Sequence, residues 1–73
     1  MNTQEITEKI QSINPETEIE KSIKEDLLVN LQNEDYTTSD YSLAIKEDLQ
    51  DSPEDYDYTI DDLEVFLFKY ELP

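Results

Sequence analysis

The chain has 73 residues and a formal net charge of −15, with 20 acidic side chains against five basic ones, all lysine. It contains no Cys and no His, which excludes disulfides, thiolate metal sites and the commonest general base. It also contains no Gly, which excludes Gly-rich phosphate loops. We therefore expect one small acidic domain, residues 1–73, that is not an enzyme and holds no cofactor.

The negative charge is concentrated in the middle of the chain. Residues 1–33 carry seven acids and three lysines, net −4, whereas residues 34–64 carry twelve acids and one lysine, net −11. Such a field repels nucleic acid and anionic membranes and attracts basic surfaces. The expected partner is therefore a basic or nucleic-acid-binding protein, with no direct binding to nucleic acid or to a membrane.

The N-terminal sequence has neither the basic segment nor the apolar segment of a secretory signal peptide. No apolar run approaches the ~18 residues that a membrane-spanning helix needs. These two observations favour a cytoplasmic protein, in the cytosol of its host cell.

The first helix is expected at residues 3–12, with Asn2 as its N-cap. The second helix is expected to begin after Asn14, which is a good N-cap, with Pro15 in the first helical position. Apolar residues recur at helical spacing in both segments. The first stripe is Ile6, Ile10 and Ile13; the second is Ile19, Ile23, Leu27 and Leu31, widened by Leu28.

A third helix is expected to start near Thr38 or Ser39 and to stop before Pro53, because the residue before a proline avoids helical angles. Its apolar face consists of Tyr41, Ala44, Ile45 and Leu49. The spacing predicts a fourth helix after Thr59, with Thr59 as N-cap and Asp62 at the N3 position. Its stripe is Ile60, Leu63, Phe66, Leu67 and Tyr70.

Residues 64–72 also alternate as a strand would, and their aromatic and β-branched residues favour a strand by propensity. A strand in this segment therefore remains an alternative to the fourth helix. The fold class that the whole pattern predicts is all-α, a compact bundle of three or four short helices. A chain of this size buries little surface, so a homodimer through the second or fourth helix is a further alternative.

Two segments resemble each other at an offset of 22 residues. The sequence from Ser22 to Leu27 matches the sequence from Ala44 to Leu49, and Asp35-Tyr36-Thr37 matches Asp57-Tyr58-Thr59. Two copies of a helix–turn–cap unit would explain the match. Chance in a chain with few residue types explains it equally well.

A calcium loop is the first site that an acidic cluster suggests. Counted from Asp55, acids fall at loop positions 1, 3 and 7, but Ile60 and Phe66 occupy the places of the required Gly and Glu. We therefore expect no metal site of this kind. Paired carboxylates also serve glycosidases, but that chemistry needs a cleft for which this chain has little room.

The acidic surface itself is the best candidate for function. Carboxylates one helical turn apart, such as Glu47 and Asp51, have Cβ atoms about 5–6 Å apart, and a row of them resembles a line of phosphates. Tyrosines lie among these acids, and tyrosine buries a large area at binding sites with few rotatable bonds. The expected partner-binding residues are Asp35, Tyr36, Asp40, Glu47, Asp48, Asp51, Glu54, Asp55, Tyr56, Asp57, Tyr58, Asp61 and Asp62.

Three of the tyrosines, namely Tyr36, Tyr56 and Tyr58, are expected in loops and exposed to a partner. Tyr41 is the tyrosine expected to belong to the core.

The composition resembles that of a class of small, acidic, Gly-poor inhibitors, often encoded by phages or mobile elements. Members of that class mimic DNA and block nucleases, CRISPR effectors, restriction enzymes or DNA-repair enzymes. The resemblance implies a stoichiometric inhibitor that occupies a phosphate-binding site, as in anti-CRISPR and anti-restriction proteins. Two alternatives stay open: an antitoxin or immunity-type protein that neutralises a basic toxin, and a small acidic adaptor subunit of a larger assembly.

Overall fold

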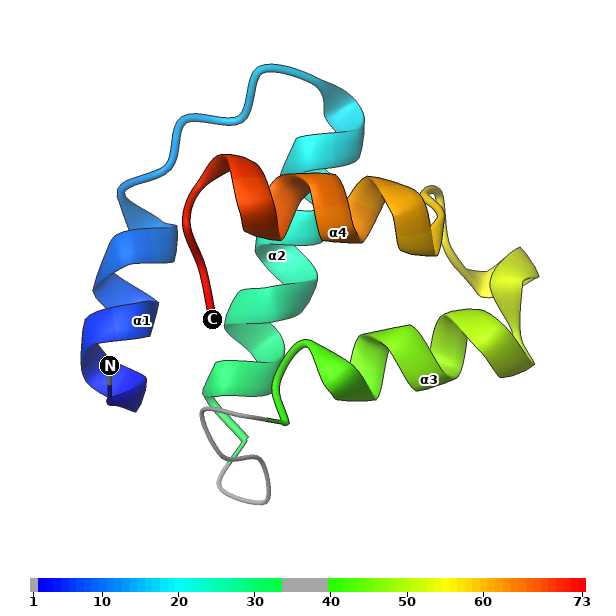
Figure 1. Cartoon of the computed structure of the whole chain (residues 1–73), viewed down its shortest axis with the longest axis horizontal. Helices are drawn as coiled ribbons and strands as arrows, with labels where there is room; N and C mark the ends of the chain where they lie inside the picture. The colour runs from blue at the N-terminus through cyan, green and yellow to red at the C-terminus, as the bar shows by residue number, and fades with distance from the viewer. Residues whose placement is uncertain (1, 34–39) are drawn as a thin grey trace.

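The computed structural model of the chain describes residues 2–33 and 40–73. These residues form the helices α1 (Thr3–Gln11), α2 (Glu18–Leu31), α3 (Leu43–Asp51) and α4 (Ile60–Lys69), with a short 3₁₀ helix, η1 (Pro53–Asp55), before α4 (Figure 1). No strand occurs in the described part of the chain. The prediction of an all-α fold is therefore confirmed.

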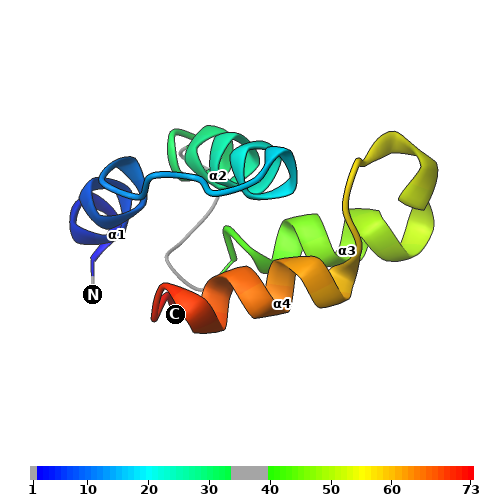
Figure 2. The ribbon, with the colours of Figure 1, turned by 90° about the horizontal axis from the view of Figure 1, so that it is seen from above.

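The helices lie in two layers. Figure 2 shows α1 and α2 side by side in one layer, and α3 and α4 in the other. Helix α2 contacts both α1 and α4, and α3 contacts η1 and α4. The Cα radius of gyration is 11.3 Å, close to the ~11 Å expected of a compact chain of this length. The short helices thus form the predicted compact bundle.

Two of the predicted helix starts are confirmed by their caps. The Asn2 side chain accepts a hydrogen bond from the Glu5 backbone N–H at 2.9 Å, at the start of α1. At the start of α4, the Thr59 hydroxyl accepts from the Asp62 N–H, and the Asp62 carboxylate accepts from the Thr59 N–H. This reciprocal pair is the capping box that the sequence predicted.

The predicted start of α2 at Asn14 and Pro15 is wrong, because the helix begins at Glu18. Thr17 is the N-cap: its backbone is extended, and its hydroxyl accepts from the Glu20 N–H at 3.1 Å. The Glu20 side chain reaches back and accepts from the Glu16 N–H at 3.2 Å. The cap therefore forms three residues later than expected, at a Thr-x-x-Glu sequence.

Helix α3 also begins later than predicted. Thr38 and Ser39 lie outside the described residues, residues 40–42 form a turn, and the helix starts at Leu43. Its predicted end before Ser52 and Pro53 is confirmed, since α3 stops at Asp51.

The strand alternative for residues 64–72 is wrong, because α4 runs to Lys69 and a turn follows. The helix ends in a Schellman motif, in which the Leu72 N–H donates to the Leu67 carbonyl and the Glu71 N–H donates to the Phe68 carbonyl. Glu71 takes the left-handed backbone position, with φ 55°, that glycine usually occupies. Packing of Leu72 against the core accompanies the turn, which explains how a chain without Gly closes this helix.

The helices α1, α2, α3 and α4 all contribute to one hydrophobic core. Its buried members are Ile6, Ile10, Ile13, Ile23, Leu27, Leu31, Tyr41, Ile45, Leu49, Tyr58, Leu63, Phe66 and Leu67. The predicted stripes supply most of these residues. Ile19 is an exception, with 40% of its surface exposed, because α2 begins at Glu18 and Ile19 falls in its first turn, at the edge of the contact with α4.

An ion-pair cluster centred on Glu20 joins the first turn of α2 to the end of α4. The Glu20 carboxylate accepts from the Lys69 ammonium at 2.8 Å and from the Tyr70 hydroxyl at 2.5 Å. The hydrogen bond from Lys69, followed by the one from Tyr70, lowers the pKa of Glu20 from 4.5 to about 2. The same Lys69 also contacts the exposed Glu16 at 3.2 Å.

The lowered pKa of Glu20 predicts how acid weakens the fold. A carboxyl group with a depressed pKa stabilises the folded state above its unfolded pKa, and this contribution is lost as the pH falls through the folded value. The Glu20→Gln variant should therefore melt below wild type at pH 7, and the gap should shrink between pH 4.5 and about 2. Thermal denaturation followed by circular dichroism at several pH values measures this gap.

Glu16→Gln is the matched control, because it removes the same charge from the exposed side of the cluster. It should change the melting temperature much less at pH 7. Equal effects of the two variants, or a gap that does not depend on pH, would contradict the role given to Glu20.

Candidate functional site

Seven of the acidic residues gather at one end of the molecule. Helix α3 leads through η1 into α4, so the last turn of α3 and the first turn of α4 lie at the same end, away from α1 (Figure 1). We call this surface the acidic end. It consists of Asp48, Asp51, Glu54, Asp55, Asp57, Asp61 and Asp62, all exposed except the partly buried Asp62.

Some carboxylates of the acidic end complement the dipole of their helix, and others oppose it. Asp61 and Asp62 stand in the first turn of α4, where carboxylates complement the positive end of the helix dipole. Asp48 and Asp51 instead stand in the last turn of α3, which has no basic residue. Negative charge there opposes the dipole. For Asp48, the hydrogen bond that its carboxylate accepts from Tyr56 offsets this effect.

The described lysines do not neutralise this surface. Within residues 2–33 and 40–73, the ion pairs shorter than 4.0 Å join Lys69 to Glu16 and Glu20. Lys24 donates instead to the backbone carbonyls of Gln11 and Ile13, and Lys9 donates to the carbonyl of Glu71. No lysine of the described residues therefore forms an ion pair within 4.0 Å with a carboxylate of the acidic end.

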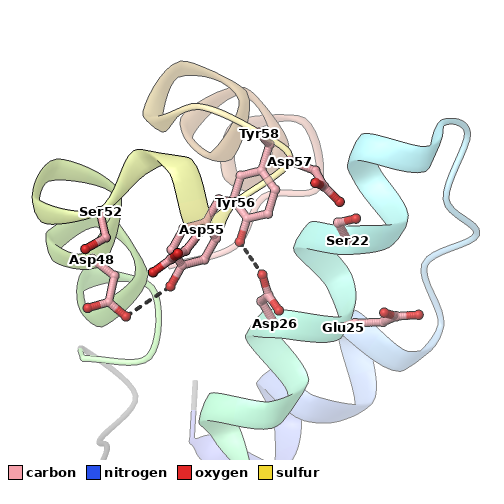
Figure 3. A pocket seen from close by; sticks show the side chains of 9 residues that line it. All are labelled: Ser22, Glu25, Asp26, Asp48, Ser52, Asp55, Tyr56, Asp57 and Tyr58. Atoms are coloured by element: carbon pink, nitrogen blue, oxygen red, sulfur yellow. Dashed lines mark hydrogen bonds between the residues drawn. The ribbon is translucent and has the colours of Figure 1, made fainter.

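A pocket of about 500 Å³ opens beside the acidic end, between α2 and the segment from the end of α3 to Tyr58 (Figure 3). Its wall contains five carboxylates and no basic side chain. The lining residues are Ser22, Glu25 and Asp26 from α2, and Asp48, Ser52, Asp55, Tyr56, Asp57 and Tyr58 from the facing segment.

Two tyrosines hold the wall of this pocket in place. Tyr58 donates its hydroxyl proton to Asp26 at 2.6 Å, and Tyr56 donates to Asp48 at 3.0 Å (Figure 3). Their rings meet edge to face, with centroids 5.5 Å apart. Burial, followed by the hydrogen bond to Asp48, raises the pKa of Tyr56 to about 12. Burial and the bond to Asp26 likewise raise the pKa of Tyr58, so both hydroxyls remain donors at neutral pH.

The structure brings most of the predicted binding residues together. Tyr56 is partly exposed beside the acidic end, and Glu47 is exposed one turn before Asp51 on α3. Asp40 stands apart, in the turn before α3. Asp35 and Tyr36 lie outside the described residues.

The expectation that Tyr58 is exposed is wrong. Only 4% of its surface is accessible, and it belongs to the core. Its hydroxyl reaches Asp26, 32 positions away in the sequence, and such a long-range contact leaves no local signal. Tyr41 is buried, as expected, and burial raises its pKa to about 12.

Sequence reasoning missed the three pocket residues from α2, because they lie in the less acidic part of the chain. The 22-residue match contains a signal for one of them. Asp26 and Asp48 occupy equivalent places in the matched segments, and each accepts a hydrogen bond from a tyrosine of the pocket wall. The two matched acids therefore have similar contacts in the pocket wall, although their partners, Tyr58 and Tyr56, are not equivalent positions of the match.

The acidic residues do not form a metal centre in the described part of the chain, where no three carboxylates lie close enough to hold an ion. The site can attract cations and accept hydrogen bonds from ammonium and guanidinium groups. Within the same residues, no helix combines the length and the apolar content needed to cross a bilayer.

Comparisons of the chain with protein-family profiles, with curated proteins and with solved structures give no match.

Proposed function

We propose that this protein is a stoichiometric inhibitor that mimics DNA and occupies the phosphate-binding site of a nucleic-acid-binding protein. Nucleases, CRISPR or restriction effectors and DNA-repair enzymes have sites of this chemistry. The observation that carries the proposal is the acidic end, where exposed carboxylates cluster without lysine partners.

The charge density supports the comparison with DNA. Over a length of 30 Å, the longest extent of the protein, a duplex carries about 18 phosphate charges at one per ~1.7 Å. The net charge of −15 on the chain is of the same order. A lysine- and arginine-lined groove built for phosphates would therefore find a comparable number of acceptors on this protein.

The placement of the acids supports a role in binding. Asp51 opposes the dipole of α3, and a high net charge of one sign destabilises a compact chain. A basic partner relieves both effects and releases counterions as it binds. The same field accelerates association with that partner.

The proposal is tested by affinity capture from a bacterial lysate on the immobilised protein. Captured proteins are eluted with a DNA oligonucleotide and, in a parallel column, with NaCl at the same ionic strength. Mimicry predicts that the oligonucleotide releases proteins that the salt leaves bound, because it competes for their phosphate sites. Proteins that leave equally in both columns would argue against mimicry, and a basic toxin that resists the oligonucleotide would favour the antitoxin alternative.

A further inference from the structure

Helix α4 presents large apolar side chains to solvent. Phe68 has 88% of its surface exposed and Val65 has 64%. They lie three residues apart, and so are neighbours on one side of the helix. Val65 also borders a shallow hollow of about 200 Å³ together with Ile19 from α2. We call Ile19, Val65 and Phe68 the apolar strip.

Each of the two exposed apolar residues, Val65 and Phe68, follows an exposed carboxylate by one helical turn. Asp61 precedes Val65 by four positions, and Glu64 precedes Phe68 by four, so each pair shares a face of the helix. The apolar strip therefore continues from the acidic end along the same helix. An isolated exposed apolar residue is ordinary on a protein surface, but a contiguous patch indicates a contact site.

We propose that Phe68 and Val65 enter a base-stacking site of a protein that binds single-stranded nucleic acid. This inference rests on the proposed function. Asp61 and Glu64 then take the places of neighbouring phosphates. Proteins that bind single strands combine a cationic groove with aromatic side chains on which unpaired bases stack. Carboxylates beside an exposed aromatic ring reproduce the two features of a single strand that such a protein binds, the phosphate charges and the unpaired base.

Charge decides between this occupant and others. A second copy of the chain would bring another net charge of −15 against the strip, along with its own Asp61 and Glu64, and like charges oppose such a contact. A protein that binds only duplex DNA needs no stacking site for an unpaired base, because in a duplex the faces of the bases are stacked on one another. Such a protein would leave the apolar strip without a matching site. A cationic groove with an aromatic platform satisfies both the acids and the apolar strip.

Peptide probes test the chemistry of the strip directly. The chain contains no Trp, so tryptophan fluorescence reports only on the probe. An octalysine peptide and the same peptide extended by two Trp, which keeps all eight ammonium groups, are compared for affinity to wild type, Phe68→Ser and Val29→Ser; octalysine, which has no fluorophore, is titrated as a competitor. Val29, on α2, is an exposed apolar residue outside the apolar strip, with 64% of its surface exposed, and serves as the control.

Wild type and Val29→Ser should bind the Trp peptide about fivefold or more tightly than octalysine, since aromatic stacking adds to the electrostatic term. Phe68→Ser should lose that preference and keep its affinity for octalysine. Because Phe68 is exposed, the variant should melt like wild type. No preference in wild type, or equal loss in Val29→Ser, would overturn the role of the strip while leaving the acidic end intact.

Two further measurements separate the alternative occupants. Proteins captured on the immobilised chain should be released by a single-stranded oligonucleotide at lower concentration than by its duplex, and fewer should be retained by the Phe68→Ser column. Preferential release by the duplex would reject the single-strand assignment but not mimicry. A wild-type dimer that Phe68→Ser dissociates in sedimentation would show that a second copy covers the strip and would overturn the proposal.

Discussion

Replacing Leu27 with alanine should lower the free energy of unfolding by about 2–5 kcal/mol. Leu27 is fully buried on α2, the helix that contacts both α1 and α4. The shorter alanine side chain leaves a cavity in the core to which these helices contribute. The core of a chain this small rarely supplies more than about 3–5 kcal/mol of net stability, and this chain adds strong self-repulsion, so the variant should be largely unfolded at physiological temperature.

Thermal and urea denaturation followed by circular dichroism measure this effect. The matched control is Val29→Ala on the same helix, where 64% of the side chain is exposed, and it should stay within about 0.5 kcal/mol of wild type. A cooperative transition of Leu27→Ala within a few degrees of wild type would mean that α2 does not organise the core.

Neutralising part of the acidic end should weaken target binding by roughly tenfold while leaving the fold intact or firmer. The variant combines Asp51→Asn, Glu54→Gln and Asp57→Asn, three exposed residues. Electrostatic steering accelerates association by about 10–10³-fold, so the loss should appear mainly in the association rate. The dependence of affinity on salt should also become shallower, because fewer counterions are released.

The matched control removes the same charge from the other layer, through Glu5→Gln, Glu8→Gln and Glu18→Gln on α1 and α2, all exposed. Association rates measured by surface plasmon resonance against an oligonucleotide-eluted protein compare the two triple variants. If the association rate falls equally in the two triple variants, net charge alone governs binding and the acidic end has no special role.

The sequence predicted the helical class well, because caps and apolar spacing agreed in most segments. In α4, the capping box of Thr59 and Asp62 and the helical stripe outweighed the strand propensity of Val65, Phe66 and Phe68. At α2, two cap sequences competed within four residues, and the hydroxyl of Thr17 with Glu20 prevailed over Asn14 and Pro15. Rules that consider only the local sequence do not decide which of two neighbouring N-caps will form.

The candidate site was predictable only where its residues are consecutive. The acids from Asp48 to Asp62 lie together because α3, η1 and α4 follow one another along the chain. The pocket also needs Asp26, which reaches it through the packing of α2 against Tyr58. Composition marked residues 34–64 as the binding region, but tertiary packing decides that Tyr58 is buried and that Phe68 remains exposed.

If this protein mimics DNA, it and nucleic acid compete for the same site on the target. The most direct measurement is a competition titration with an oligonucleotide-eluted target, fluorescently labelled DNA and increasing amounts of this protein. Mimicry predicts complete displacement, with the apparent dissociation constant for DNA rising linearly with the concentration of this protein. A ternary complex, in which the target binds both partners without mutual loss of affinity, would contradict the account.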